Sequence, residues 1–401
     1  MAALLESSSL FSICFYFAIV VGLFTLGDWL DIITKSKISA MFILLISFML
    51  LFMFKVIPTD IIDRAGLTDA SKFAMPILIF HMGSMFNVRQ LINEWKAVAT
   101  AALGMLAAMI GIFCIIPIIG RDSAMVTIPI INGALVATNL MVEAATAKGM
   151  ALAAALGPLV FSIQIFISTP LISQSGTLEG KRLLNHYREC KAQGITLSAK
   201  SEAAAASEKA KFYQKHSKYF STNTCIFLTV LGGAISVALG ELTGISYSII
   251  ALLLSVIASE IGILPEKVLD RAKTTGFISM VSLASVIPSL ANVSIDDIGK
   301  LLLQVVCVFA ATIIASLLLV CVLPGWKLLG SKSLAFGVVM CQMSGFPVTY
   351  LISERIANSL GETEEEKSYI LEMLSPKFVV AGLASVTVLS VIVAGIFSKL
   401  L

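Results

Sequence analysis

The chain has 401 residues, of which 58% are hydrophobic and 13% charged, and its mean hydropathy is +0.95. A soluble domain carries about 25% charged residues, so this composition excludes an ordinary soluble protein and predicts an integral membrane protein. The net charge of +3 is too small, and too dispersed among loops, to indicate nucleic-acid binding.

Ten apolar segments approach the length of about 20 residues that a transmembrane helix needs. The segment 176–220 carries nine Lys and Arg and divides them into two groups of five. We therefore predict an N-terminal repeat at 1–175, a cytoplasmic basic linker at 176–220 and a C-terminal repeat at 221–401. The predicted spans are 9–29, 38–57, 72–88, 95–118 and 150–174 in the first repeat, and 221–239, 246–264, 273–291, 299–323 and 368–400 in the second.

Two further segments, 122–148 and 331–358, differ from these spans. Each begins apolar, meets Gly together with Asn, Thr, Ser or Gln, and then becomes amphipathic and charged. Polar backbone at membrane depth is tolerated only where protein or a water-filled cavity satisfies it. We interpret both segments as re-entrant hairpins; the alternative is two ordinary spans with small residues on their packing faces.

The distribution of charge supports the hairpins, because short loops rich in Lys and Arg stay in the cytoplasm. With the basic linker inside and each half counted as five spans and one hairpin, both termini fall outside. Counting the hairpins as full spans breaks this pattern at several loops. The inside positions include Lys35, Lys37, Arg89, Lys96, Lys267, Arg271, Lys273, Lys327 and Lys332, and the outside positions include Asp60, Asp63, Asp69, Asp296 and Asp297.

An odd number of spans in each half predicts that the second half is inverted relative to the first. Short matches recur in the same order: DASK at 69–72 and DRAK at 270–273, then Pro117 and Pro324, then LGP at 156–158 and LSP at 374–376. Inverted repeats with interrupted helices at corresponding positions are typical of secondary transporters, whose binding site lies where the two interruptions meet.

This order of five spans and a hairpin, repeated, resembles the ion-transporter superfamily. That superfamily includes sodium/glutamate symporters, 2-hydroxycarboxylate (citrate) sodium symporters and the beta subunits of sodium-pumping decarboxylases. The segment SGFPVTYLISERIANSLGETEEEKSYILEMLSPKFVVAGLASV at 344–386 is the most similar part. The hairpin tips, NGALVATN and CQMSGFP, lack the glycine-rich motifs of the symporters and the acidic motif of the beta subunits, so this chain looks like a divergent member.

The resemblance implies an all-α membrane protein built from a scaffold and an elevator-type transport domain, working as a homodimer. It also implies two cations that bind substrate carboxylates, and Arg355 and Lys377 stand at the corresponding places. Arginine suits a carboxylate because its guanidinium forms paired hydrogen bonds. The alternatives are an interfacial Arg355 paired with Glu354 or Glu143, and a Lys377 that reaches out to the membrane surface.

The hairpin tips supply the other candidate ligands. Free N–H groups of half-helices favour anions, and unwound carbonyls with hydroxyls and amides suit a hard cation such as Na⁺. The alternative for each single side chain is a helix-packing hydrogen bond, worth about 0.6 kcal/mol. The candidate substrate ligands are Ser344, Gly345, Thr349, Asn132 and Asn139, and the candidate Na⁺ ligands are Gly133, Thr138, Asn139 and Ser344.

Glu143 is a possible titrating group, although a solvated carboxylate at a helix end is the simpler interpretation. His81 lies inside a predicted span and fits a hydrogen-bonded packing role better than proton relay. The seven cysteines form no CxxC pair, and no phosphate-binding loop, HExxH or GxSxG motif is present in the sequence.

The sequence thus predicts a sodium-coupled symporter, not an enzyme, for a small carboxylate such as an acidic amino acid or a dicarboxylate. We expect it in the inner (plasma) membrane, in contact with lipid. Two alternatives remain at this point: a sodium-pump subunit of a decarboxylase complex, and a proton-coupled or uncoupled organic anion transporter.

Overall fold

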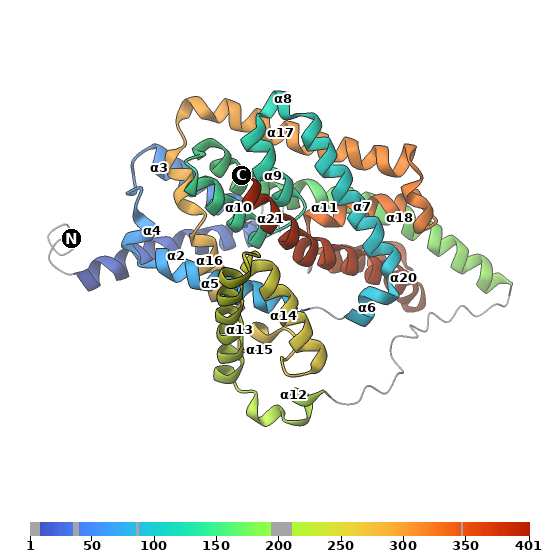
Figure 1. Ribbon diagram of the computed structural model, residues 1–401. Coiled ribbons are helices and arrows are strands. Elements are labelled where there is room, and N and C mark those ends of the chain that lie inside the picture. Colours follow the sequence, from blue (N-terminus) through green and yellow to red (C-terminus); the bar gives the residue numbers. More distant parts are fainter. Residues whose placement is uncertain (1–8, 35–39, 86–87, 194–210, 346–347) are drawn as a thin grey trace.

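The computed structural model describes residues 9–34, 40–85, 88–193, 211–345 and 348–401, and all regular structure within them is helical (Figure 1). The all-α prediction is therefore confirmed for this part of the chain. Lys35, Lys37 and positions 194–210 of the predicted linker lie outside the described residues.

The first half contains ten helices among its described residues. Four correspond to the first four predicted spans, α9 and α10 to the first interrupted segment, and α11 to the fifth span. The main helices are α2 Ser9–Ile33, α3 Ala40–Met53, α5 Leu67–Ser84, α7 Trp95–Cys114, α9 Arg121–Ile131, α10 Leu135–Ala147 and α11 Ala151–Ala192, and the short ones are α4 Ile61–Arg64, α6 Val88–Asn93 and α8 Ile116–Ile119.

The second half has short 3₁₀ and π segments between its main helices. The main helices are α13 Thr222–Thr243, α14 Tyr247–Ile261, α16 Thr275–Ala284, α17 Ile295–Leu317, α18 Lys332–Met340, α19 Val348–Leu360, α20 Glu364–Ala384 and α21 Ser390–Leu400. The short elements are α12 Phe212–Lys215, η2 Ser217–Tyr219, α15 Val268–Arg271, η3 Ile287–Asn292, η4 Leu318–Val322, η5 Pro324–Leu328, η6 Cys341–Met343 and η7 Ser385–Leu389.

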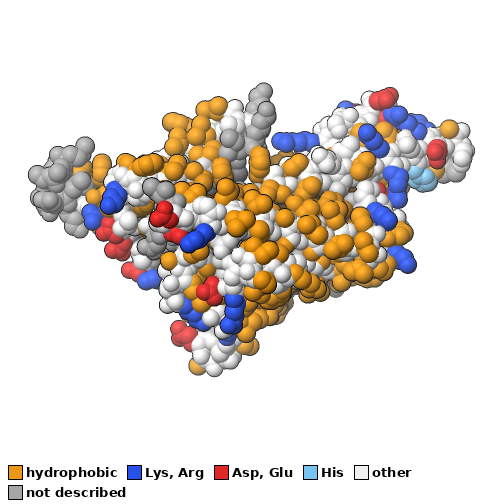
Figure 2. Space-filling view, turned by 90° about the horizontal axis from the view of Figure 1, so that it is seen from above, with side chains coloured by type: hydrophobic (Ala, Val, Ile, Leu, Met, Phe, Trp, Pro, Cys, Tyr) orange, Lys and Arg blue, Asp and Glu red, His pale blue; other side chains and the backbone are white. Residues whose placement is uncertain are grey.

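Six helical stretches of the described chain are long and apolar enough to cross a membrane. Hydrophobic side chains cover much of the face in Figure 2, whereas many charged side chains lie along its edges and on a protruding lobe. Length, composition and surface therefore agree with a membrane protein. The six stretches are Leu10–Leu30, Trp95–Cys114, Ala151–Ala192, Thr222–Thr243, Asp296–Val322 and Glu364–Leu400.

The helices form two packed groups. In the first, α5 lies against α13, α14 and α16; in the second, α7 and α11 pack with α17, α18 and α20 (Figure 1). Small residues permit the close approach of α5 and α14: a Cβ added to Gly83 would lie 2.7 Å from the Cβ of Ser255. Such small-residue contacts are typical of helix packing in membranes, where backbones approach closely.

The predicted end of the fifth span near residue 174 is wrong, because α11 continues to Ala192. The extension 176–192 keeps a helical pattern of buried residues, including Gly180, Leu183 and Leu184. A Cβ at Gly180 would lie 2.7 Å from Leu360 Cδ1, so this face packs against the end of α19. The first part of the basic segment is therefore a packed helix rather than a loop.

Candidate functional site

The first interrupted segment folds back on itself. The start of α9 and the start of α11 line one pocket, which includes Arg121, Asp122, Ala151 and Leu152. The chain that enters α9 and the chain that leaves α10 therefore lie at the same end of α11. We call α9, residues 132–134 and α10 hairpin one, with its base at this pocket and its tip at residues 132–134.

The tip of hairpin one is held against α11 and the last helix. The Gln164 amide on α11 donates to the Gly133 carbonyl at 2.9 Å, and the Asn132 amide donates to the Ile128 carbonyl at 2.8 Å. A Cβ at Gly133 would lie 2.8 Å from the Cβ of Ser390. A β-carbon does not fit this close approach, which explains the need for glycine at position 133.

The second interrupted segment also folds back. At its start, the hydroxyls of Ser331 and Ser333 donate to the Glu179 carboxylate on α11, the latter at 2.7 Å. At its end, Leu360 packs against Gly180, the next residue of α11. We call α18, η6 and α19 hairpin two, with its base at Glu179 and its tip at Ser344 and Gly345; residues 346–347 lie outside the described residues.

The two tips meet near the middle of α11. The Ser168 hydroxyl is hydrogen-bonded to that of Ser344 at the tip of hairpin two, whereas Gln164 binds the tip of hairpin one. Four residues of a helix rise about 6 Å, so the two contacts lie roughly one turn apart. The hairpins thus approach from opposite ends of α11, and their tips converge.

The last helix also contacts both tips, but it meets the tip of hairpin two before the tip of hairpin one. A Cβ at Gly345 would lie 3.1 Å from Val386, and a Cβ at Gly133 would approach Ser390, four residues later. Gly345 has φ +65°, a left-handed conformation that glycine adopts without strain. Residues 385–389 between these contacts form a π-helical turn, which is frequent at functional sites.

Buried polar atoms without a hydrogen-bond partner gather on these elements. Among the described residues they include Asn132 Oδ1, Gln164 Oε1, Thr349 Oγ1 and both amide atoms of Gln342. Leaving such a group unpaired costs about 1–3 kcal/mol, so the region has the capacity to bind a polar ligand. Neutral oxygens of this kind suit a hard cation, and no group of three or more His, Cys, Asp or Glu in the described chain could hold a metal ion.

Asn132, Gly133, Ser344 and Gly345 all lie at the converging tips, where the sequence placed them. Thr349 is the second residue of α19, where its Cγ2 is 3.0 Å from a Cβ added to Gly382 of α20. These five predicted site residues are therefore brought together with the last helix.

Thr138 and Asn139 lie further along α10. The Thr138 hydroxyl donates to the Ala134 carbonyl at 3.1 Å, within its own helix. The Asn139 amide donates to the Ser282 hydroxyl at 2.8 Å, across to α16. Asn139 therefore links hairpin one to the first helix group and directs its amide nitrogen away from the tips.

The two predicted cations do not contact the tips. Arg355 is exposed on α19 and forms no ion pair with a described residue, while its neighbour Ile356 packs on Gly176. Lys377 is half-buried on α20 and donates to the Met373 carbonyl at 3.0 Å, one turn back. Arg355 is thus seven residues, or about 10 Å of helix, beyond Val348, the first residue of α19.

The predicted titrating residues lie apart from the tips as well. Glu143 is exposed near the end of α10, and the positive charge of Lys72 on α5 favours its ionised carboxylate. His81 is buried, and its Nδ1 accepts the backbone N–H of Leu269 at 3.2 Å. This contact agrees with the expected packing role of His81.

Four residues of this region were missed in the sequence: Gln164, Ser168, Gln342 and Glu179. Gln164 is the residue that a sequence signal identifies best, because it interrupts an apolar run at 159–167. Gln342 lies within the tip motif CQMSG, and the polar interruption that identified Ser344 there identifies Gln342 equally well. Ser168 and Glu179 carry no such signal, since their partners come from more than 150 residues away.

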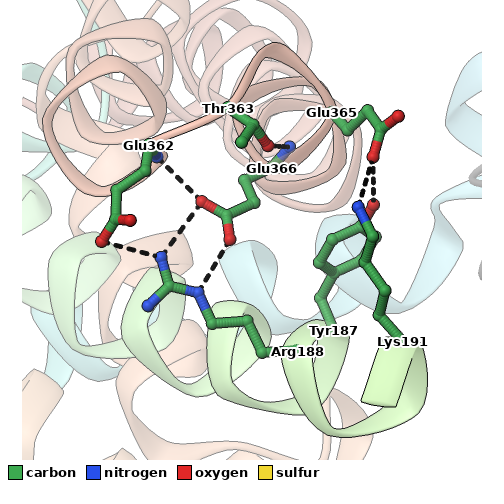
Figure 3. Close-up of polar contacts among 7 residues, drawn as sticks. All are labelled: Tyr187, Arg188, Lys191, Glu362, Thr363, Glu365 and Glu366. Atoms are coloured by element: carbon green, nitrogen blue, oxygen red, sulfur yellow. Dashed lines mark hydrogen bonds and ion pairs between the residues drawn. The ribbon is translucent and has the colours of Figure 1, made fainter. Parts of the chain in front are cut away.

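An ion-pair cluster ties the extension of α11 to the start of α20, ahead of the predicted span 368–400 (Figure 3). Arg188 Nε lies 2.7 Å from Glu366 Oε1, Arg188 Nη2 lies 3.0 Å from Glu362 Oε1, and Lys191 Nζ lies 2.7 Å from Glu365 Oε2. The hydrogen bond from Arg188 lowers the pKa of the Glu366 carboxyl to about 2. The cluster therefore holds the chain next to the base of hairpin two.

Comparison with models of known protein families and with curated proteins finds no match for this chain. The geometry of the two hairpins is therefore the basis for inferring function.

Proposed function

We propose that the chain is an ion-coupled secondary transporter for a small carboxylate, with its binding site between the two hairpin tips. The observation that carries this proposal is the convergence of both tips on Gln164 and Ser168, one turn apart on α11. Two broken helical segments whose tips meet at one place are the arrangement that transporters use to bind a substrate and a coupling ion.

The membrane topology belongs to the proposal. With the basic segment 176–220 in the cytoplasm, the base of hairpin two is cytoplasmic, and the base of hairpin one and both termini are outside. Packing supports an inverted repeat: α3 contacts η3 and α11, whereas α14, its counterpart, contacts α5 and α21. Each second helix thus packs on the third helix of the other half and on one of the two long tip-binding helices.

The tips offer chemistry for both ligands. The N-terminal N–H groups of α10 and α19 face the tip region and favour a carboxylate. The unpartnered oxygens of Asn132, Gln164 and Thr349 favour Na⁺, the proposed coupling ion. Arg355 lies within hairpin two, on α19, and Lys377 lies on the neighbouring α20, so both cations are close to the proposed path of the anion without contacting the tips.

We further propose that the hairpins with α11, α20 and α21 form the mobile unit of an elevator, and that α5, α13, α14 and α16 belong to the scaffold of a homodimer in the inner (plasma) membrane. The contact of Asn139 with Ser282 lies between these two groups. An elevator movement would break and remake that contact.

The test is uptake into proteoliposomes that contain the purified full chain. We expect an inward Na⁺ gradient to drive accumulation of at least one of radiolabelled L-aspartate, L-glutamate, L-malate and citrate. Gln164→Leu is expected to reduce uptake at least about tenfold, because it removes the hydrogen bond to Gly133 and a buried acceptor. The matched control is Gln193→Leu, at the exposed end of the same helix.

Na⁺-independent uptake that follows the pH gradient would favour proton coupling instead. Equal uptake by Gln164→Leu and Gln193→Leu would show that the hairpin tips do not form the transport site.

A further inference from the structure

The pocket at the base of hairpin one is separate from the tips and has its own chemistry. It has a volume of about 340 Å³ and is lined by residues 119–123, residues 150–153 and Gln304 of α17. Its distance along α11 from Gln164 is more than ten residues, or about 15 Å. This volume is sufficient for a small organic acid.

Two helix N-termini open into this pocket. Arg121, Asp122 and Ser123 form the first turn of α9, and Ala151–Ala153 form the first turn of α11. Each helix N-terminus carries about half an elementary charge, from N–H groups without helical partners. The charges of Arg121 and Asp122 offset each other, so the two helix ends leave a net positive potential that favours an anion.

A second observation indicates that the ligand also carries a hydrogen-bond donor. The Gln304 amide donates to the Ile119 carbonyl at 2.8 Å and to the Ser123 hydroxyl at 3.1 Å. Gln304 is only 8% exposed, and its Oε1 has no partner among the described residues. Gln304 is one of the residues that line the pocket, and a hydroxyl or an ammonium group of a ligand would supply the donor that its buried Oε1 lacks.

Arg121 and Asp122 are both exposed, and neither forms an ion pair with a described residue. The pocket therefore offers the Arg121 cation and two helix N-termini to a ligand carboxylate. It offers the Asp122 carboxylate and the neutral Gln304 Oε1 to a donor group of the same ligand. A ligand that carries both functions on adjacent atoms satisfies all of these groups.

We propose that this pocket is a second binding site, in which an α-amino or α-hydroxy carboxylate is captured before it reaches the tips. The proposal deepens the proposed function, on which it rests, because it places a capture site at the outer mouth of hairpin one. Arg121 and the two helix N-termini bind the carboxylate. Gln304 Oε1 and Asp122 accept hydrogen bonds from the ammonium or hydroxyl group.

The experiment measures binding by calorimetry to the purified full chain in phosphatidylcholine nanodiscs. The probes are L-aspartate, L-malate and succinate; succinate lacks the donor group on the α-carbon. To isolate the pocket, the measurements use the Gln164→Leu background, in which the tip site is impaired. We expect L-aspartate and L-malate to bind at least about tenfold more tightly than succinate, because satisfying one buried acceptor changes affinity by about this factor.

Arg121→Ala is expected to weaken binding of L-aspartate and L-malate at least about tenfold, and Arg121→Lys to restore part of the affinity. The matched control is Arg271→Ala, an exposed arginine outside the pocket, which should leave affinity unchanged. Equal affinities for the three acids, or unchanged affinity in Arg121→Ala, would overturn the proposal.

A phosphatidylethanolamine headgroup has the same pairing of an ammonium with an anion, so a second arm uses nanodiscs of that lipid. Binding that persists supports a solute site, whereas binding lost only in phosphatidylethanolamine would mean that lipid occupies the pocket and would overturn the solute proposal.

The capture site and the transport function fail in distinguishable ways. In otherwise unmodified protein, Arg121→Ala should raise the KM for uptake and leave kcat unchanged, whereas Gln164→Leu should reduce uptake without affecting binding at the pocket. Absence of uptake in the unmodified chain, together with Arg121-dependent binding, would refute the transporter and retain the pocket.

Discussion

The two hairpins are alike at their tips and different at their bases. Both tips place a glycine against the last helix and a hydrogen bond on α11. The base of hairpin two is closed by the buried Glu179 carboxylate and two serines, whereas the base of hairpin one surrounds an open pocket with exposed Arg121 and Asp122. Under the proposed function, the shared tips are the transport site, and the unequal bases distinguish an open end from a closed one.

The largest effect is expected at the tip that both long helices contact. In Gly133→Val, the new side chain would meet Ala137 and Ser390, whose Cβ atoms lie within 2.8 Å of an added Cβ. We expect a loss of stability near the upper end of the ~1–3 kcal/mol typical of overpacking, together with loss of uptake. A thermal melt and the proteoliposome assay measure the two effects.

The matched control is Gly276→Val in α16, because a Cβ added there has no atom within 4 Å. Equal melting temperatures for the two variants would mean that the tip of hairpin one is not packed as described.

An intermediate effect is expected at the closed base of hairpin two. Glu179→Ala removes the acceptor of the Ser331 and Ser333 hydroxyls in a buried place, which costs about 1–2 kcal/mol. Because the serines start α18, hydrogen exchange should increase first in residues 331–340. Glu189→Ala, at an exposed position of the same helix, should leave both the melting temperature and the exchange unchanged.

The smallest effect is expected from the pH dependence of the ion-pair cluster. Glu366 has its pKa lowered from 4.5 to about 2, so the native state binds the proton less readily than the unfolded chain does. This contribution to stability is complete above the unfolded value and is lost as pH falls from 4.5 towards 2. Arg188 is 43% exposed, so solvent and salt screen the pair and the shift in melting temperature should be a few degrees at most.

Melting temperatures measured from pH 7 to pH 3 provide the check. Glu366→Gln should flatten the decline below pH 4.5, whereas Glu372→Gln, an exposed residue further along α20, should retain it. Identical curves for both variants would show that the ion-pair cluster does not cause the decline in stability at low pH.

The features that local sequence reveals were predicted best. The polar interruptions at Asn132–Gly133 and Ser344–Gly345 break apolar helices, and they lie at the two tips. The length of α11 was not predicted, because charged residues beyond 176 suggested a solvated linker while Leu183 and Leu184 face a packed surface. Contacts such as Ser168 with Ser344 join distant parts of the chain, and no local pattern encodes them.

Residue roles were harder to predict than positions. Asn139 occurs in the tip motif, yet the turn of α10 directs its amide to Ser282 of α16. Arg355 follows the second tip in sequence, but about two turns of α19 carry it towards the base of the hairpin. Distance along a helix axis therefore decides which residues of a motif reach the site.

A cysteine pair across the tip contact tests the central claim most directly. The substitutions are Ser168→Cys and Ser344→Cys in a background whose seven native cysteines are replaced by serine. Because the two hydroxyls are hydrogen-bonded, the account predicts a disulfide on mild oxidation, loss of uptake, and recovery of uptake with reductant. Ser168→Cys with Ser398→Cys serves as the unpaired control. A folded protein in which the 168–344 pair forms no disulfide would contradict the convergence of the two tips.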